Sequence, residues 1–287
     1  MLSIVGPGGI GGVLAGVVGQ AGFDVEVVAR PSTASVINER GISLRSKQYG
    51  DIDVKVPART EPTPGSLVVI AAKSYTIPEI SDSIAASKPQ EIVALCNGIT
   101  HRDVVHEIPS PRTTCGSIRI ISERVAPGQY LHHSAGSIIT LEDAAKDWDI
   151  PRILTKAGMD VRFGGSEKRV LWDKLRFLAP MALLTASTGA TIGPAREGSE
   201  PLLEEIAAIT SAEGVPTTAS ELMDNLASID DDADSSLGRD VNAGNRTELD
   251  ALGHDLVRIA ATHSIPTPVL EQTIASIERR SYEYSIS

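Results

Sequence analysis

The stretch that decides the fold is LSIVGPGGIGGVLAGVVGQAG, residues 2–22. Its apolar start is typical of a buried strand, and the Gly- and Ala-rich pattern that follows is typical of a helix ending at Gly22. Between the two stands GPGGIG, which matches G-x-G-x-x-G in the strand–loop–helix context that this motif requires. The stretch therefore predicts the opening of a nucleotide-binding α/β domain.

The spacing of the glycines predicts that this loop binds a dinucleotide. The first glycine permits a tight turn, the second lets the backbone approach a pyrophosphate, and the third lets the helix pack on the strand. The N–H groups at the start of the helix then face the phosphates. The candidate cofactor-binding residues of the loop are Gly6, Pro7, Gly8, Gly9, Ile10 and Gly11.

The end of the second expected strand, DVEVVAR at residues 24–30, bears on which dinucleotide is bound. Proteins that bind NAD usually place an acid here, to hold the ribose 2′-hydroxyl. In this chain Asp24 and Glu26 come earlier, and the strand ends at Arg30. A guanidinium can bind a 2′-phosphate by two hydrogen bonds, so Arg30 favours NADPH/NADP+. The other interpretation is an exposed arginine at a strand end.

The pattern along the chain changes near residue 165. Before it, strand-like runs at residues 66–73, 91–98 and 160–164 alternate with helical stretches, which indicates a doubly wound, mostly parallel sheet. Residues 115–141 suggest an antiparallel extension around Pro127–Gly128. From Ser166 onward the pattern is helical. We therefore expect an α/β Rossmann-type domain at 1–165 and an all-α domain at 166–287.

Composition narrows the class of partner. A net charge of −11 with 3% aromatic residues argues against nucleic acid, which requires basic patches and stacking platforms. Apolar runs are broken well before membrane-spanning length, and the start of the chain has no basic leader. Cys96 and Cys115 are too few for a disulfide scaffold. We expect a cytoplasmic protein without a membrane partner; the oligomeric state stays open, a homodimer included.

No metal is expected. The run Asp230, Asp231, Asp232 and Asp234 has the start of a calcium loop, but Ser235 stands where that loop needs glycine and Val241 where it needs glutamate. The histidines lack a supporting pattern of cysteines or carboxylates.

A lysine stands on the apolar face of LWDKLRFLAPMALLTAS, residues 171–187. At helical spacing, Lys174 shares its face with Leu178, Met181, Ala182 and Thr185. Burying an unpaired cation is costly. Either the stem lies on apolar surface while the head reaches water, or the amine opens into a cleft where a reaction occurs.

Three further segments carry polar groups. Lys73 and the pair Asn97–Gly98 end expected parallel strands, at the sheet edge where ligands bind, and Glu248 stands in NRTELDAL, residues 245–252. Taken singly, each has an ordinary interpretation as a surface residue, a turn or a solvated helix position.

In this order, the motifs GPGGIG, VVAR, AAKSY, LCNG, LWDKL, SSLGRD, NRTELDAL and IPTP resemble the ketopantoate reductase (2-dehydropantoate 2-reductase) family over essentially the whole chain. The W-x-K-L helix followed by S-S-x-x-x-D and R-x-T-E-[IL]-D is the more specific part. The resemblance implies a Rossmann domain and a helical domain with the site in the cleft between them. It also implies NADPH-dependent reduction of a 2-oxo acid, ketopantoate, to pantoate.

The resemblance also implies roles for individual residues. Lys174 matches the catalytic lysine that protonates or polarises the developing alkoxide, and Glu248 matches the acid that orients the substrate hydroxyl and helps place that lysine. The other matches are Ser236 for the substrate carboxylate, Asn97 for cofactor and substrate, and Lys73 and Arg30 for the cofactor.

One departure from the family concerns the substrate. The family usually has asparagines four and eight residues after the lysine, where this chain has Leu178 and Ala182, while Thr185 keeps its place. Apolar pockets discriminate weakly, whereas pockets that hydrogen-bond a substrate hydroxyl discriminate strongly. Two alternatives therefore stay open: the same chemistry on a more apolar 2-oxo acid, and a sensor that binds NADPH or a metabolite without turnover.

Overall fold

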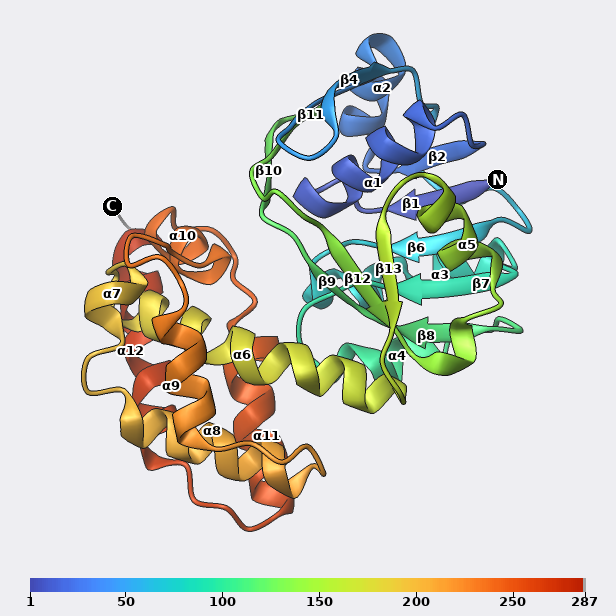
Figure 1. The fold of residues 1–287 in the computed structure, drawn as a ribbon. Coiled ribbons are helices and arrows are strands. Elements are labelled where there is room, and N and C mark those ends of the chain that lie inside the picture. Colours follow the sequence, from blue (N-terminus) through green and yellow to red (C-terminus); the bar gives the residue numbers. More distant parts are fainter. Residues whose placement is uncertain (286–287) are drawn as a thin grey trace. The chain divides into compact units, whose positions relative to one another are not determined.

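The computed structural model describes residues 1–285, which form two compact units. The first consists of Met1–Cys96 and His101–Val170, and the second of Asn97–Thr100 together with the chain from Leu171 onward. Figure 1 shows the strands and helices of the first unit and the helices of the second. The short segment Asn97–Thr100 therefore belongs with the helices, although it follows a strand of the first unit.

The first unit is built on a six-stranded sheet in the order β5-β2-β1-β6-β7-β8, and all its strand pairs are parallel. Strands β1, β2 and β7 are buried along their whole length, as expected of a parallel sheet covered on both faces. The prediction of a parallel, doubly wound α/β unit is confirmed. The strands are β1 (Leu2–Val5), β2 (Val25–Val28), β5 (Ala58–Arg59), β6 (Leu67–Ile70), β7 (Glu91–Ala94) and β8 (Thr113–Cys115).

The first unit also contains helices, which lie between its strands. They are α1 (Gly9–Gln20), α2 (Pro31–Arg40), η1 (Ser74–Thr76), α3 (Ile77–Ala86), α4 (His101–His106), η2 (Asp143–Ala145) and α5 (Asp149–Lys156). The first of them follows the glycine loop at once, as its sequence predicts. Its buried side is formed by small and β-branched residues such as Val13, Ala15 and Val17, which let the helix lie close to the sheet.

Two smaller sheets complete the first unit. One has the order β10-β11-β3-β4 and the other β13-β12-β9. Strands β10 and β11 form the antiparallel hairpin predicted around Pro127–Gly128, whereas the β3–β4 hairpin was not predicted from the sequence. The strands are β3 (Ile42–Ser46), β4 (Gly50–Val54), β9 (Ser117–Arg119), β10 (Ser122–Ala126), β11 (Gln129–His132), β12 (Ile138–Leu141) and β13 (Asp160–Phe163).

The second unit is helical, as predicted. Trp172, Leu183 and Ile206 are fully buried in its core, and α6 stays a single helix across Pro180. In the part of the chain that the structure describes, no helix has the length and apolarity to cross a bilayer. The helices are α6 (Glu167–Thr188), α7 (Ile192–Ala195), α8 (Glu200–Ala212), α9 (Ala219–Ala227), α10 (Ser236–Asn242), the π-helical turn η3 (Asp250–His254), α11 (Asp255–Thr262) and α12 (Pro268–Ser285).

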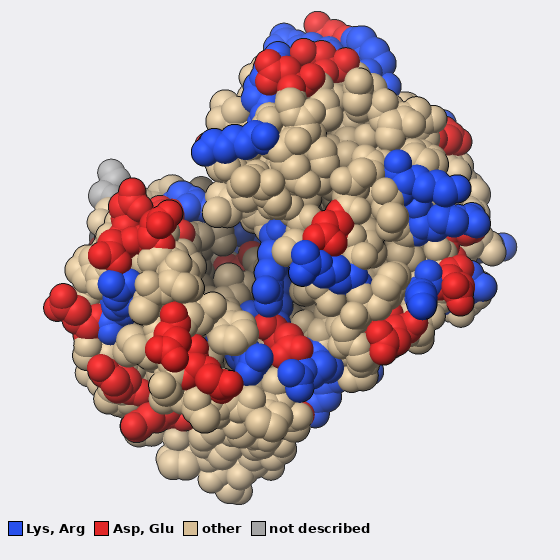
Figure 2. All heavy atoms as spheres, in the orientation of Figure 1, with Lys and Arg blue, Asp and Glu red and all other residues tan. Residues whose placement is uncertain are grey.

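The net charge is divided unequally between the two halves of the chain. Residues 171–287 contain 19 Asp and Glu against 8 Lys and Arg, whereas residues 1–170 contain 18 of each. Acidic side chains gather over the helical unit in Figure 2. The net charge of −11 therefore comes from residues 171–287. The unit with the glycine loop has no net charge that would repel an anionic ligand.

A buried carboxylate fixes the start of α6, whose residues up to Val170 belong to the first unit. Glu167 is 6% exposed and accepts hydrogen bonds from the Cys115 N–H at 2.6 Å and from His106 Nε2 at 2.8 Å. It also forms an ion pair with Arg102. Burial, the largest single influence, raises the pKa of Glu167, but the hydrogen bonds from Cys115, His106 and Arg102 together lower it. The carboxylate therefore ties α4, β8 and α6 together in its ionised form.

We expect Glu167→Gln to lower the free energy of unfolding by on the order of 2 kcal/mol at neutral pH, because it removes a buried carboxylate charge that accepts several hydrogen bonds. Folding lowers the pKa of Glu167 from its ordinary 4.5, so its contribution is present above about pH 4.5 and is lost as pH falls through the folded-state value. Denaturant unfolding between pH 7 and pH 3 should show the two proteins converging in acid. The exposed neighbour Glu107→Gln is the control, and a difference that does not depend on pH would contradict the prediction.

Candidate active site

The glycine loop has the steric features that a bound pyrophosphate requires. Gly6 has a φ of +91°, and a Cβ there would lie 2.8 Å from Ala72. A Cβ at Gly11 would lie 2.2 Å from the Gly6 carbonyl oxygen, whereas a Cβ at Gly8 would meet no atom within 4 Å. Gly6 and Gly11 are thus needed for close packing, and Gly8 faces open space. Helix α1 begins at Gly9, so the N–H groups of its first turn lie beside that space and fit an anionic diphosphate.

The β10–β11 hairpin supports the loop from behind. The Tyr130 hydroxyl donates a hydrogen bond to the Pro7 carbonyl at 3.2 Å, and burial raises the pKa of this hydroxyl, which keeps it a donor. A Cβ at Gly12 would lie 2.1 Å from the Tyr130 ring, and one at Gly9 would lie 2.8 Å from the Ser122 carbonyl oxygen. Two more glycines of the stretch are therefore set by tertiary contacts that the motif itself does not predict.

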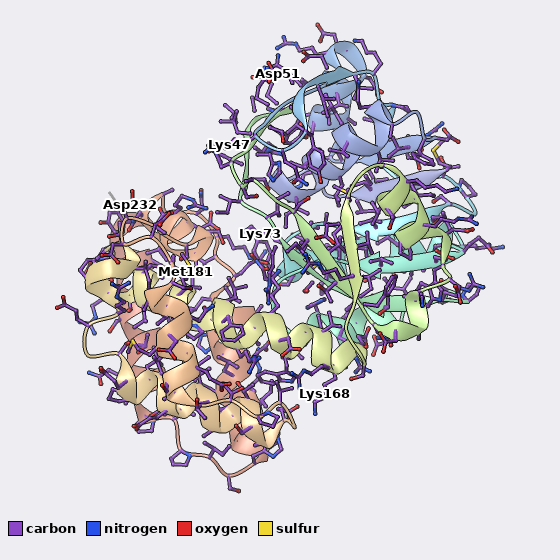
Figure 3. The ribbon with its side chains drawn as sticks, viewed as in Figure 1. Lys47, Asp51, Lys73, Lys168, Met181 and Asp232 are labelled. Atoms are coloured by element: carbon purple, nitrogen blue, oxygen red, sulfur yellow. The ribbon has the colours of Figure 1, made fainter. Side chains whose placement is uncertain are left out.

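Two candidate cofactor-side cations lie at the same sheet edge as the loop. Arg30 is exposed and directly precedes α2, after β2 has ended at Val28. Lys73 is half-buried and directly precedes η1, after β6 has ended at Ile70 (Figure 3). Both strands end earlier than predicted, so the two side chains come from the loops that follow them. The carboxyl edge of a parallel sheet is where such folds bind ligands.

The acid of the second strand has a structural role. Glu26 is fully buried, and its carboxylate accepts hydrogen bonds from Ser3 Oγ at 2.6 Å and from the Thr63 N–H at 2.7 Å. It also pairs with Arg59 Nε at 2.9 Å. This carboxylate secures the loop before β6 and is not exposed to a ribose.

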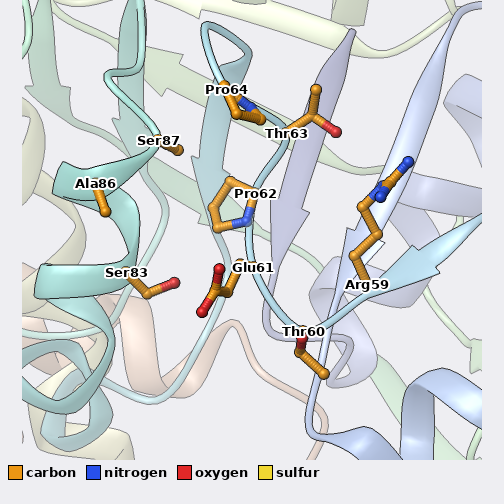
Figure 4. Close-up of a pocket in the computed structure, with 9 residues that line it drawn as sticks. All are labelled: Arg59, Thr60, Glu61, Pro62, Thr63, Pro64, Ser83, Ala86 and Ser87. Carbon is orange, nitrogen blue, oxygen red and sulfur yellow. The ribbon is translucent and has the colours of Figure 1, made fainter.

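A hollow of about 430 Å³ lies beside that loop (Figure 4). Residues 59–64 line it together with Ser83, Ala86 and Ser87 from the end of α3 and the turn after it. The loop runs from Arg59, which pairs with Val28 at the carboxyl end of β2, to residue 64, shortly before β6 begins. The glycine loop, residues 6–11, does not contribute to the lining of this hollow.

Three of the predicted site residues form one chain of hydrogen bonds within the helical unit. Lys174 Nζ donates to Asn97 Oδ1 at 2.7 Å, and Asn97 Nδ2 donates to Glu248 Oε2 at 3.1 Å. An ammonium can only donate and a carboxylate can only accept, so the amide has a single orientation that satisfies both neighbours. Glu248 is 4% exposed, and Lys174 is half-buried. The ammonium on the apolar face of α6 therefore has a fixed polar partner.

Ser236 is the first residue of α10 and is exposed. Its neighbour Ser235 caps this helix by accepting the Gly238 N–H at 2.9 Å, and its hydroxyl lies 2.7 Å from Thr185 Oγ1 on α6. Thr185 is on the face of α6 that carries Lys174, so the contact ties the start of α10 to that face.

The positions between Lys174 and Thr185 on this face are apolar. Leu178 and Met181 are half-buried, and Ala182 is 1% exposed; Met181 is labelled in Figure 3. The acidic run before α10 is engaged in ion pairs, Asp231 with Arg196 and Asp234 with Arg239. Among residues 1–285, no group of three or more His, Cys, Asp or Glu side chains is arranged to hold a metal ion.

A dinucleotide loop at the edge of a parallel sheet, followed by a helical unit with a held ammonium, defines a dinucleotide-dependent oxidoreductase. Residues 2–145 match the family model described as ketopantoate reductase PanE/ApbA, and residues 168–281 match the model of its C-terminal part. The chain belongs to the ketopantoate reductase PanE/ApbA family and is an NAD(P)-dependent oxidoreductase, which confirms the resemblance found in its motifs.

Two distant relatives match this chain over nearly its whole length. An uncharacterized oxidoreductase, YkpB, of Bacillus subtilis is 25% identical and covers 96% of this chain and 97% of its own. A 2-dehydropantoate 2-reductase of Halobacterium salinarum is 24% identical with the same coverage. The crystal structure of a PanE/ApbA family ketopantoate reductase from Ralstonia eutropha has a TM-score of 0.89 at 24% identity, covering 99% of both chains. The ternary structure of D-mandelate dehydrogenase with NADH and anilino(oxo)acetate has a TM-score of 0.88 at 16% identity, with equal coverage, and shows a shared fold.

Gly8→Ala should weaken dinucleotide binding by about tenfold or more while the melting temperature stays unchanged, because its methyl group enters the space that the pyrophosphate needs. Gly11→Ala should instead lower the melting temperature, because its methyl group meets the Gly6 carbonyl. Fluorescence titration with NADPH and thermal unfolding measure the two effects. Equal dinucleotide affinity in Gly8→Ala and the wild type would remove this loop from the binding site.

Proposed function

We propose that this protein reduces a 2-oxo acid to the corresponding 2-hydroxy acid with NADPH. The first candidate substrate is 2-dehydropantoate, which is reduced to pantoate in the biosynthesis of pantothenate. The observation that carries the proposal is the Lys174–Asn97–Glu248 hydrogen-bond chain in a member of this family. The full-length match to relatives named 2-dehydropantoate 2-reductase supports it.

The first unit would hold the cofactor. The loop from Gly6 to Gly11 would bind the pyrophosphate, and the guanidinium of Arg30 would bind the 2′-phosphate that distinguishes NADPH from NADH. Lys73, at the same edge, would add a second cation. When bound, the cofactor supplies a hydride to the 2-keto carbon.

The helical unit would supply the acid. As the carbonyl oxygen becomes an alkoxide, the Lys174 ammonium stabilises the negative charge and transfers a proton to it. The Asn97 amide holds the ammonium in place, and Glu248 orients both the amide and the substrate hydroxyl. Ser236 would bind the substrate carboxylate. These assignments follow the roles that the family resemblance implies.

A more apolar 2-oxo acid is the second candidate. The half-buried side chains of Leu178 and Met181, with Ala182, give the Lys174 face of α6 no amide that could hold a substrate hydroxyl. A branched or aromatic side chain of the substrate would bury apolar surface there at roughly 25 cal/mol per Å². The shared fold of D-mandelate dehydrogenase accommodates an aromatic oxo acid, anilino(oxo)acetate, in that protein.

The proposal is tested by NADPH oxidation with 2-dehydropantoate and with branched and aromatic 2-oxo acids, each repeated with NADH. We expect turnover that prefers NADPH. We also expect Lys174→Ala to lower kcat by about 10²–10⁴-fold, because it removes the proton donor. Its affinity for NADPH should stay within about twofold of the wild type, because Lys174 does not form part of the pyrophosphate loop.

Lys168→Ala, exposed on the same helix, is the matched control and should leave turnover unchanged. NADPH binding without oxidation across the whole panel would contradict the proposal and indicate a sensor. Substantial turnover by Lys174→Ala would remove this lysine from the mechanism.

Leu178→Asn should raise the ratio of kcat/KM for 2-dehydropantoate to kcat/KM for an aromatic 2-oxo acid by about tenfold, because an amide can bind the substrate hydroxyl and disfavours apolar side chains. Steady-state kinetics with both substrates measure the ratio. Ser187→Asn, further along α6, controls for a general effect of asparagine in this helix. An unchanged ratio in Leu178→Asn would show that Leu178 does not contact the substrate.

A further inference from the structure

We propose that Thr100 and Asp255 form a positioning pair that holds Asn97 in place between Lys174 and Glu248. The pair does not touch the reacting atoms; it acts through the backbone of Asn97–Thr100. This inference rests on the proposed function, because it assigns the pair a role in proton transfer by Lys174.

The segment Asn97–Thr100 runs along the π-helical turn η3 in register. The Asn97 side chain donates a hydrogen bond to Glu248, which lies just before the turn. A Cβ at Gly98 would lie 2.8 Å from the Cβ of Ala251, which lies inside the turn. Thr100 Oγ1 donates to Asp255 Oδ2 at 2.5 Å, and Asp255 lies just after the turn. The three contacts follow the same order along both segments, so the short segment is held at both ends of the turn and in its middle.

Gly98 allows this close approach. Its φ is +88°, and it is buried against the Ala251 backbone as well as its side chain, with the carbonyl oxygen 2.9 Å from the position of a Cβ. Any side chain at this position would push the segment away from η3. Because only two residues separate Asn97 from Thr100, fixing Thr100 leaves the Asn97 backbone little freedom.

Asp255 is a stiff anchor because it is itself held. Its side chain is fully buried and forms an ion pair with Arg258, one turn along α11. Arg258 also pairs with Asp250 at 3.2 Å, at the other end of η3. Its two carboxylate partners are the main cause of the raised pKa of Arg258. The charge on Asp255 is therefore compensated, and one of its oxygens stays available to Thr100.

Thr100→Val removes the hydroxyl without changing the volume of the side chain. We expect kcat to fall by about tenfold or more, because small displacements of positioning groups are costly to the rate. The KM for NADPH should stay within about twofold of the wild type. Thr100→Ser restores the hydroxyl and should recover most of the rate. Thr262→Val is the matched control, since Thr262 lies exposed on α11 with its hydroxyl bonded to its own helix.

A double-mutant cycle with Asn97→Ala separates positioning from a structural role. If Thr100 acts through Asn97, Thr100→Val should lower kcat in the wild type and have little further effect in Asn97→Ala. Additive losses in kcat, or a lower melting temperature with kcat unchanged, would overturn the proposal.

Hydrogen exchange gives a readout that does not depend on turnover. The amides of residues 97–100 should exchange faster in Thr100→Val than in the wild type. Their exchange should be unaffected in Thr262→Val, and equal exchange in all three proteins would overturn the proposal.

If the wild type reduces none of the 2-oxo acids, the proposed function fails. In that case the exchange rates alone decide whether the pair fixes the segment.

Discussion

The hydrogen bonds that join Lys174 to Glu248 through the Asn97 amide are the interaction on which the helical unit is organised. A half-buried ammonium loses part of its contact with water, and the Asn97 amide replaces that contact with a hydrogen bond without adding charge. This requires a segment after β7 to leave the first unit and pack on η3, which explains why Gly98 has a left-handed backbone and lies against Ala251. The π-turn lies between Glu248 and Asp255, the two carboxylates that hold the ends of this segment.

Buried carboxylates recur as ties between segments that are distant in sequence. Glu26 secures the loop before β6, and Glu91 accepts the Asp149 and Ile150 N–H groups at the start of α5 as well as Arg112. Glu167 joins the beginning of α6 to α4 and β8. Each has several donors, as a buried charge must, so the acid in β2 that could be taken for a ribose ligand is already engaged in the fold.

The distribution of charge bears on how anions would bind. The first unit has no net charge, so in the proposed site a dinucleotide would be attracted by the N-terminus of α1 and by the local cations Arg30 and Lys73. The helical unit is strongly acidic, so an anionic substrate would have to be held by short-range contacts around Lys174. Under the proposed function, the apolar side chains of Leu178 and Met181 would then select the uncharged part of the substrate by packing against it.

The sequence alone determined the class of fold, the glycine loop, the change from α/β to helical structure and the family, because these depend on local periodicity and on motifs of short spacing. It also singled out Lys174, Asn97 and Glu248, but as separate matches to a family pattern. Only the tertiary structure joined them by hydrogen bonds, assigned Asn97–Thr100 to the helical unit, placed Tyr130 behind the loop and engaged Glu26 inside the sheet. These contacts bring together residues far apart in the chain, and no local preference encodes them; they follow from which buried polar groups can satisfy one another once the core is packed.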